Sequence, residues 1–200
     1  MRPLRPPRDE EEPTGGGGAP PPPPPIRHLD INIIRVGFED FTAEDDAELA
    51  NAIQVTRAIY ARVRLNLRTV TFWRISVSEA AEHAIIDSAA EAEDLTWDWT
   101  VPNDALDVFV VRVMNDADGW SAVDGSCDKN SKGMTGSVVS LNGDAANSAN
   151  TLAHEVGHYL GLEHIPDDGN IVGNNGSSDA FTGIHAWQGV VMRRHCFVRA

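Results

Sequence analysis

Two histidines four residues apart, His154 and His158, form the strongest chemical pattern in this 200-residue sequence. On an α-helix, four residues turn the chain through about 400° and advance it about 6 Å, so both imidazoles lie on one face. One metal ion can then bind both rings at the usual zinc–nitrogen distance of about 2.0–2.1 Å. Glu155 lies about 100° around the helix from His154, so it flanks the metal without binding it. Its carboxylate is predicted to act as a general base toward a water on the metal.

His164 is a third candidate ligand, although a continuous helix would carry it about 15 Å along the axis from His154. Gly161 removes this obstacle, because a glycine adopts the left-handed conformation that ends a helix and reverses the chain. Three histidines and one water then form an open tetrahedral site, which is typical of a catalytic zinc. The residues therefore predict one zinc ion per chain, since three neutral imidazoles suit zinc.

The run from His154 to His164, HEVGHYLGLEH, resembles the HExxHxxGxxH signature of the metzincin zinc metalloendopeptidases, especially the matrix metalloproteinase and reprolysin-like group. The resemblance implies three metal ligands, His154, His158 and His164. It also implies that Glu155 is the general base and that Gly161 is the turn glycine. The expected activity is hydrolysis of peptide bonds in protein or peptide substrates.

The resemblance also indicates what surrounds the metal. Metzincins place a methionine turn beneath the metal; Val172 occupies that position here, and Met192 is expected in the core. A short segment falls where the family pairs an edge strand with extended substrate: Ser137, Val138, Val139 and Ser140. The wall of the pocket beyond the scissile bond is expected in residues 174–180.

The elements that position these residues follow from hydrophobic patterning. Strands are predicted over 31–38, 70–77, 107–114 and 137–141. Helices are predicted over 43–64 with Thr42 as N-cap, over the ambiguous stretch 78–95, from Asn147 or Ser148 to Leu160, and from near Thr182 onward. Residues 115–136 are expected to form a long loop. This order predicts an α/β (α+β) fold with a mixed twisted sheet, a long helix, a zinc-binding helix and a small C-terminal subdomain ending in a helix.

Residues 1–25 contain 10 of the 12 prolines together with four consecutive glycines. Such a segment buries too little apolar area to offset its ordering entropy, so a disordered tail is predicted. A linker role is favoured, and docking to a reader of proline-rich peptides is the alternative. Residues 26–200 are expected to be the peptidase domain, with an upper subdomain (26–161) and a lower one (162–200).

The charge balance is 16 Lys and Arg against 30 Asp and Glu, a net charge of −14. This balance argues against nucleic acid and anionic membrane as partners. No apolar run reaches the length of a membrane span, and no apolar segment of a secretory signal follows the basic N-terminus. We expect a monomer that is extracellular or exported without a recognisable signal peptide, with a cytoplasmic location left open.

Two cysteines, Cys127 and Cys196, exclude a disulfide-dense scaffold and a four-cysteine zinc site. A single disulfide between them would tie the loop to the C-terminal helix, and a Cys127 thiolate that caps the zinc is the alternative. Residues 115–119 resemble part of a calcium loop. Because the first ligand position is Met114 and no glutamate closes the loop, a plain turn is favoured over Ca²⁺ binding.

Two alternatives to a secreted peptidase remain open. One is a non-catalytic zinc-binding recognition module on the same fold, and the other is a delivered toxin or effector metalloprotease. The intact Glu155 favours catalysis, since a recognition module has no need of a general base.

Overall fold

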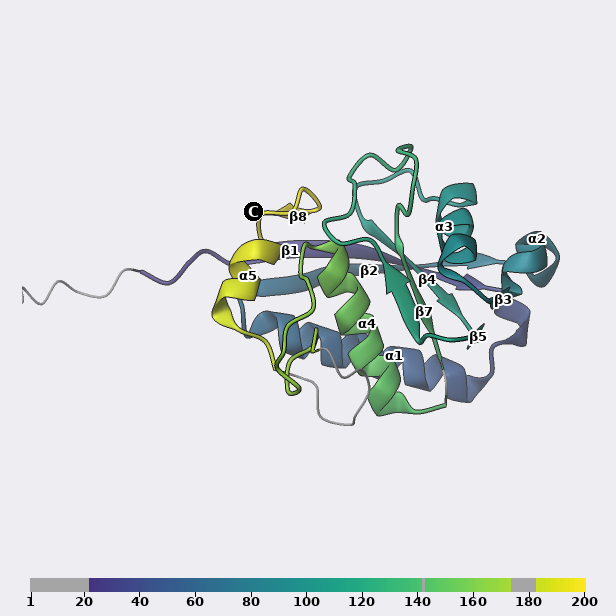
Figure 1. Cartoon of the computed structure of the whole chain (residues 1–200), viewed down its shortest axis with the longest axis horizontal. Coiled ribbons are helices and arrows are strands. Elements are labelled where there is room, and N and C mark those ends of the chain that lie inside the picture. The colour runs from purple at the N-terminus through teal and green to yellow at the C-terminus, as the bar shows by residue number, and fades with distance from the viewer. Residues whose placement is uncertain (1–21, 142, 174–182) are drawn as a thin grey trace, which may run out of the picture.

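A largely parallel β-sheet lies at the centre of the computed structural model, which describes residues 22–141, 143–173 and 183–200 (Figure 1). The strands follow the order β2-β1-β4-β7-β6, with β8 paired to β1. Their bounds are β1 (Arg27–Val36), β2 (Leu65–Ile75), β4 (Leu106–Val111), β6 (Gly119–Ser121), β7 (Ser137–Ser140) and β8 (Val198–Arg199). β6 and β8 are antiparallel to their neighbours, and the other pairings are parallel. A separate parallel pair joins β3 (Ile85–Ile86) and β5 (Val113–Met114).

Helices cover both faces of this sheet. α1 (Ala43–Ala61) and α4 (Ala145–Tyr159) lie against each other on one face, whereas α2 (Val77–Ala80) and α3 (Ala89–Asp98) contribute to the core of the other face (Figure 1). α5 (Ala186–Met192) lies near the end of the sheet where β8 meets β1, and two short 3-10 helices are η1 (Phe38–Asp40) and η2 (Ala81–Ala84). The predicted mixed α/β fold is confirmed.

Alternating side chains divide the core into two layers. In β1, Ile31 and Ile33 face α1 and α4, whereas Ile34 faces the opposite layer. In β4, Val108 and Phe109 divide in the same way. Because successive residues of a strand point to opposite faces, a sheet covered on both sides needs apolar residues at every position. This requirement explains the unbroken apolar run in β4.

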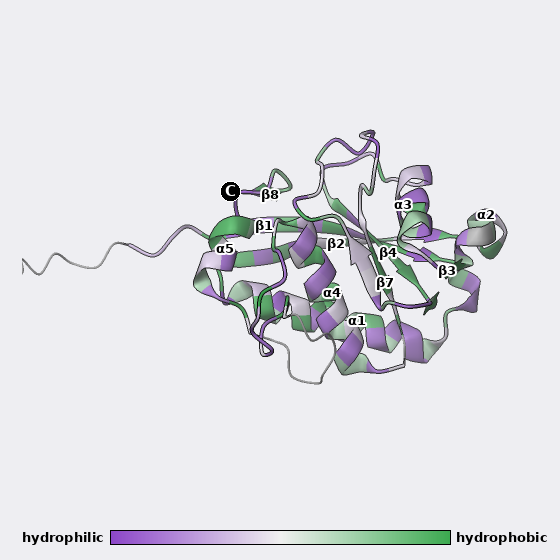
Figure 2. Cartoon of the chain, viewed as in Figure 1, coloured by the Kyte–Doolittle hydropathy of each residue, from purple (hydrophilic) through white to green (hydrophobic). Residues whose placement is uncertain are grey.

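α1 and α4 are fixed to each other by packing and by two buried hydrogen bonds, one of which runs from the Ser148 hydroxyl in α4 to the Glu48 carboxylate in α1. α1 begins after Thr42, which forms a reciprocal capping box with Asp45 as expected from the sequence. Near its other end, the hydroxyl of the fully buried Tyr60 donates to the carbonyl of Ala153 in α4 at 2.7 Å. Figure 2 shows polar and apolar residues alternating along both helices, as expected for helices with one face on the core.

The prediction that Ser137–Ser140 form the edge strand is wrong. These residues form β7, all four are buried, and β7 lies between β4 and β6. In the described part of the chain, β6 is the edge strand on this side of the sheet, and its residues Gly119, Trp120 and Ser121 pair with Val139, Val138 and Ser137. β6 lies inside the stretch that the sequence indicated as a loop, because three residues among glycine, aspartate and serine give almost no strand pattern.

The other predicted elements differ from the structure mainly in where they begin and end. The ambiguous stretch 78–95 divides into α2, η2, β3 and the start of α3, and the predicted long zinc-binding helix begins earlier, at Ala145. The C-terminal helix begins at Ala186 and is followed by β8, which we did not predict. Most of the predicted tail (1–21) and the expected pocket wall (174–180) lie outside the described residues.

None of the helices in the described ranges has the length and apolar character of a transmembrane span.

Candidate metal centre

α4 carries three of the candidate site residues and is held in place by its N-cap and by burial. It begins after Asp144, whose carboxylate accepts hydrogen bonds from the amides of Ala146 (2.9 Å) and Asn147 (3.2 Å), the usual contacts of an N-cap. Eleven of its 15 residues are buried, so the helix is held along most of its length. Its rigid backbone fixes His154, Glu155 and His158 relative to one another.

The end of α4 turns as the sequence predicted. Gly161 has a φ of +96°, the amide of Gly161 donates to His158 O (2.8 Å), and the amide of Leu162 donates to Gly157 O (3.0 Å). These two bonds define a Schellman motif, which ends a helix with a left-handed residue. The chain therefore reverses after α4 and brings His164 back toward the first two histidines.

The three imidazoles converge through their Nε2 atoms. The separations are 2.8 Å between His154 and His158, and 3.1 Å from His164 to each of them. The Nδ1–H of His154 donates to Ile171 O at 2.6 Å, and that of His158 donates to Leu162 O at 2.5 Å. Both rings in their neutral forms therefore present an unprotonated Nε2 to the common point.

Burial keeps the first two imidazoles neutral. Desolvation lowers the pKa of His154 to about 4, and the neighbouring His158 acts in the same direction. Desolvation also lowers the pKa of His158. At neutral pH these rings are therefore uncharged, which is the form that binds a metal ion.

This arrangement fits a zinc ion. Nitrogen lone pairs facing one another at about 3 Å repel unless a cation lies between them. Tetrahedral zinc with bonds of about 2.0–2.1 Å places its nitrogen ligands about 3.3 Å apart, about 0.2–0.5 Å more than the observed separations. Carbonyl acceptors behind the two helical histidines are the usual outer partners of zinc-binding imidazoles.

Glu155 lies beside the histidine cluster, packed against the edge strand. Only 6% of the residue is exposed, and burial raises the pKa of its carboxyl group to about 8. A β-carbon added to Gly119 would lie 2.6 Å from Glu155 Cγ and 2.9 Å from Oε1. The glutamate therefore occupies the space that any larger residue at position 119 would fill.

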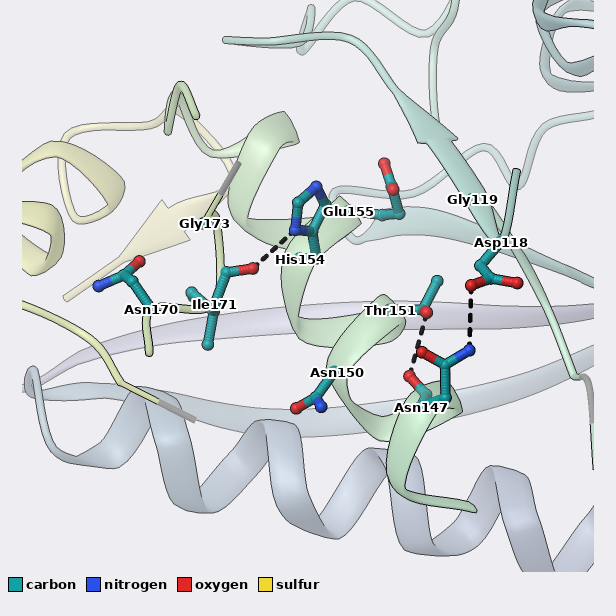
Figure 3. A pocket seen from close by; sticks show the side chains of 10 residues that line it. All are labelled: Asp118, Gly119, Asn147, Asn150, Thr151, His154, Glu155, Asn170, Ile171 and Gly173. Atoms are coloured by element: carbon teal, nitrogen blue, oxygen red, sulfur yellow. Dashed lines mark hydrogen bonds between the residues drawn. The ribbon is translucent and has the colours of Figure 1, made fainter. Parts of the chain in front are cut away.

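His154 and Glu155 line a cavity of about 240 Å³ between α4, the start of β6 and the turn after His164 (Figure 3). The same cavity is lined by Asp118, Gly119, Asn147, Asn150, Thr151, Asn170, Ile171 and Gly173. Most of these side chains are polar, and the amide of Asn147 donates to Asp118 Oδ2 at 3.0 Å (Figure 3). The cavity therefore reaches the candidate base and one of the candidate metal ligands, His154.

Val172 lies in a buried turn that supports the cluster. It is fully buried, and its Cγ1 lies 3.7 Å from the position of a β-carbon added to Gly157 in α4. The preceding carbonyl, Ile171 O, is the acceptor for His154. Met192 is also fully buried, in the core cluster shared with α1 and α4. Val172 therefore lies in a buried turn next to α4 and Met192 lies in the core, whereas a place for Val172 beneath the metal stays a prediction.

Sequence reasoning missed the pair that holds this turn. Asn170 and Gln188 are almost fully buried, and their side-chain amides exchange two hydrogen bonds of 2.8 and 2.9 Å. Asn170 Oδ1 also accepts the amide of Val172 at 3.2 Å. Two isolated amides 18 residues apart give no pattern in a sequence, although a polar residue beside the apolar pair Ile171–Val172 is typical of a buried turn.

The remaining candidates lie elsewhere. Cys127 and Cys196 are joined by a disulfide, with His195 beside Cys127 Sγ. Because its sulfur is in the disulfide, Cys127 cannot cap the metal as a free thiolate in this structure. Residues 115–119 turn into β6, with Asp116 in the left-handed region (φ +66°). Within the described ranges, groups of three converging metal-ligating side chains occur at the three histidines and at Cys127, His195 and Cys196.

Comparisons with known proteins agree with this geometry. The family described as Metallo-peptidase family M12B Reprolysin-like matches residues 47–165, more than half of the chain. Metalloproteinase-II from Bacteroides fragilis has a similar fold, with a TM-score of 0.62 and 16% identity over 88% of this chain and 55% of its own. A chain from a chaperone–substrate complex is also similar, with a TM-score of 0.53 and 16% identity over 75% of this chain and 31% of its own. No curated protein matches the chain in sequence.

The present chain thus spans about half the length of the Bacteroides metalloproteinase chain. At 16% identity, the two structural likenesses carry information about the fold alone.

Proposed function

The chain belongs to the reprolysin-like M12B metallopeptidase family, and from this premise we propose that it is a zinc-dependent endopeptidase with Glu155 as its general base. Members of this family are metallopeptidases that use zinc. The observation that carries the proposal is the convergence of three imidazole Nε2 atoms within 3.1 Å of one another, beside a buried glutamate in an open cavity.

One zinc ion per chain would be held by His154, His158 and His164. When bound, zinc supplies a Lewis acid for the scissile carbonyl and a positive charge that favours the ionised form of Glu155. The protein's own contribution is to hold the ligands ready. Ile171 O and Leu162 O fix the ring orientation of the two helical histidines, and the turn at Gly161 returns the third.

Glu155 acts as the proton carrier in this proposal. Its carboxylate takes a proton from the attacking water and passes it to the leaving amine as the peptide bond breaks. Because only 6% of Glu155 is exposed, bulk water is excluded from most of the side chain, which strengthens its electrostatic interactions. The contact with β6 restricts the rotation of the side chain and keeps the carboxylate in the cavity.

The edge strand β6 is the proposed support for the substrate. Among the described residues β6 pairs with β7 alone, so its other side would offer backbone groups to an extended peptide. Gly119 is the first residue of β6 and also lines the cavity, so a peptide added at this edge would pass Glu155 (Figure 3). This strand replaces Ser137–Ser140 as the candidate substrate-binding segment. We also propose that the chain acts as a monomer on protein or peptide substrates.

Of two other readings, only the recognition module predicts a different result in the experiment that tests the proposal. A recognition module would bind zinc and peptides without turnover, and a delivered effector would cleave proteins of a target cell. A peptide library derived from a proteome is digested with the zinc-loaded chain, with the chain treated with chelator, and with the chelated chain after zinc is restored. We expect cleavage that disappears with the chelator and returns with zinc. Cleavage that persists after complete metal removal would contradict the proposal, and so would no cleavage by a zinc-loaded, folded chain.

A further inference from the structure

A second group of metal-ligating side chains lies away from the histidine cluster, around the disulfide. Cys127, His195 and Cys196 bring their donor atoms within 4.8 Å of one another. Cys127 belongs to the loop before β7, and the other two residues follow α5. While the disulfide is intact, neither sulfur can bind a metal as a thiolate.

We propose that reduction of the Cys127–Cys196 disulfide creates a second, tetrahedral metal site made of two thiolates and the Nδ1 atom of His195. The site would take a soft or borderline divalent cation such as zinc, with its fourth position open to water. The bound metal would hold the two segments together under reducing conditions, as the disulfide does when it is intact. This inference is independent of the proposed peptidase activity.

The orientation of His195 supports the proposal. Its Nε2–H donates to Gly125 O at 2.8 Å, so Nδ1 carries the lone pair in the neutral ring. That nitrogen lies 3.9 Å from Cys127 Sγ. The amide of Phe197 donates to the same nitrogen over 3.3 Å, a long bond that a metal would displace. His195 is only 6% exposed, so a bound metal would be shielded on the imidazole side.

Contacts other than the disulfide hold the Cys127 segment in place. The amides of Asp124 and Gly125 donate to His158 O (3.0 Å) and Tyr159 O (2.9 Å), at the end of α4. The hydroxyl of Tyr159 donates to Ser126 O at 2.7 Å. On the other side of the cysteine, Lys129 forms a buried ion pair of 2.8 Å with Asp107 in β4. The backbone on both sides of Cys127 is therefore anchored without the sulfur–sulfur bond.

The Cys196 segment has its own anchors. The amide of Val198 donates to His195 O at 2.9 Å, and β8 pairs with β1 through Leu29 and His28. Phe197 is buried in the main core. After reduction both thiols therefore remain close to each other and to His195. Little chain entropy is then lost on metal binding, because the ligands are already ordered.

Reduction of the Cys127–Cys196 disulfide requires an external reductant. A dithiol gives two electrons and two protons to the disulfide, which becomes two thiols, while the dithiol becomes a cyclic disulfide. Metal binding then releases the two thiol protons to solvent. Cys196 is exposed and Cys127 is half-buried, so a reductant can reach the bond.

Cobalt(II) titration of the full chain, with and without a tertiary phosphine reductant, tests the proposal. The phosphine takes oxygen from water and does not leave a competing thiol. We expect one equivalent of cobalt in the oxidised chain, and a second equivalent in the reduced chain with a thiolate-to-cobalt charge-transfer band. Because the chain contains two cysteines, any such band reports on them alone. Zinc should displace the cobalt and remove the band.

Two variants serve as matched controls. The Cys127→Ser/Cys196→Ser variant should keep the fold and the first equivalent but show no band under the same conditions. His195→Gln keeps an N–H donor for Gly125 O but lacks the ligand nitrogen. It should weaken binding of the second cobalt by at least about tenfold, since even outer partners contribute about 10–100-fold to metal affinity.

Several results would overturn the proposal. One is a reduced chain that binds no more cobalt than the oxidised chain, and another is a band unchanged in position and affinity in His195→Gln. A band that appears only in a dimer by sedimentation would show ligands shared between two chains. Loss of the folded circular-dichroism spectrum on reduction, before cobalt is added, would contradict the argument that other contacts hold both segments.

Discussion

Replacing Gly119 by alanine should disable Glu155 without touching a metal ligand. Gly119 begins the edge strand β6, and its backbone has no positive φ that would strain an alanine. The added β-carbon would lie 2.6 Å from Glu155 Cγ, 2.9 Å from Oε1 and 3.0 Å from Cδ. Nonbonded carbons at ordinary contact lie about 3.5–4.0 Å apart, so the glutamate must move by about 1 Å.

The size of the effect follows from this displacement. Misplacing a catalytic group by about 1 Å can cost about 10²-fold in rate. We therefore expect the kcat of Gly119→Ala to fall by about 10²-fold while the zinc content stays unchanged. The overpacking cost to stability should be near the lower end of about 1–3 kcal/mol, because a short edge strand can shift more easily than a central one.

Hydrolysis of a fluorogenic peptide and zinc content by mass spectrometry, measured on the same samples, check this prediction. Gly169→Ala is a matched control, because its β-carbon would have an ordinary 3.6 Å contact with Asp167 Oδ1 and no positive φ is involved. The control should hydrolyse the peptide at the parental rate. A Gly119→Ala chain that retains activity within about threefold of the parent would refute the steric argument, because it would mean that the Glu155 side chain had not been displaced.

Three further substitutions test the frame around the metal. Gly157→Ala should raise the free energy of unfolding by about 0.5–1 kcal/mol, measured by urea denaturation, because helical glycine is replaced and the new methyl group has contacts of 3.4–3.7 Å. Val172→Asp should abolish stable folding or zinc binding, since it buries an unpaired carboxylate; circular dichroism of a normally folded, zinc-loaded variant would disprove this. Gln188→Leu should lower the free energy of unfolding by about 1–3 kcal/mol, because Asn170 loses its partner in the turn that orients His154. It should also weaken zinc binding by about 10–100-fold in competition with a chelator. An unchanged zinc affinity would show that this turn does not support the metal site.

Much of the candidate site could be predicted because it is local in sequence. His154, Glu155 and His158 occupy one helix, whose geometry fixes their relative directions. The helix end depends on Gly161, and the left-handed conformation of this residue follows from the absence of a β-carbon. These features depend on backbone geometry over about three helical turns, so they could be worked out without tertiary information.

The parts that could not be predicted depend on which segments become neighbours. The segment Ser137–Ser140 has strand character, but local pattern does not tell an internal strand from an edge strand. β7 is internal because β6 pairs with its outer side, and in β6 only Trp120 is of a residue type that favours strands. The Asn170–Gln188 pair likewise joins two elements through tertiary packing. The predicted α/β class was robust because the apolar run in β4 requires a sheet covered on both faces.

The central claim is that three histidines hold a zinc ion and Glu155 supplies the base, and Glu155→Gln tests it most directly. Zinc content and peptide hydrolysis should be measured on one preparation of the variant beside the parent. The account predicts one zinc per chain in both proteins and a loss of about 10²–10⁴-fold in kcat for the variant, the usual contribution of a general base. Hydrolysis by Glu155→Gln within about tenfold of the parent, with zinc bound, would contradict the role of Glu155. Loss of zinc from the variant would show instead that Glu155 is needed to hold the metal.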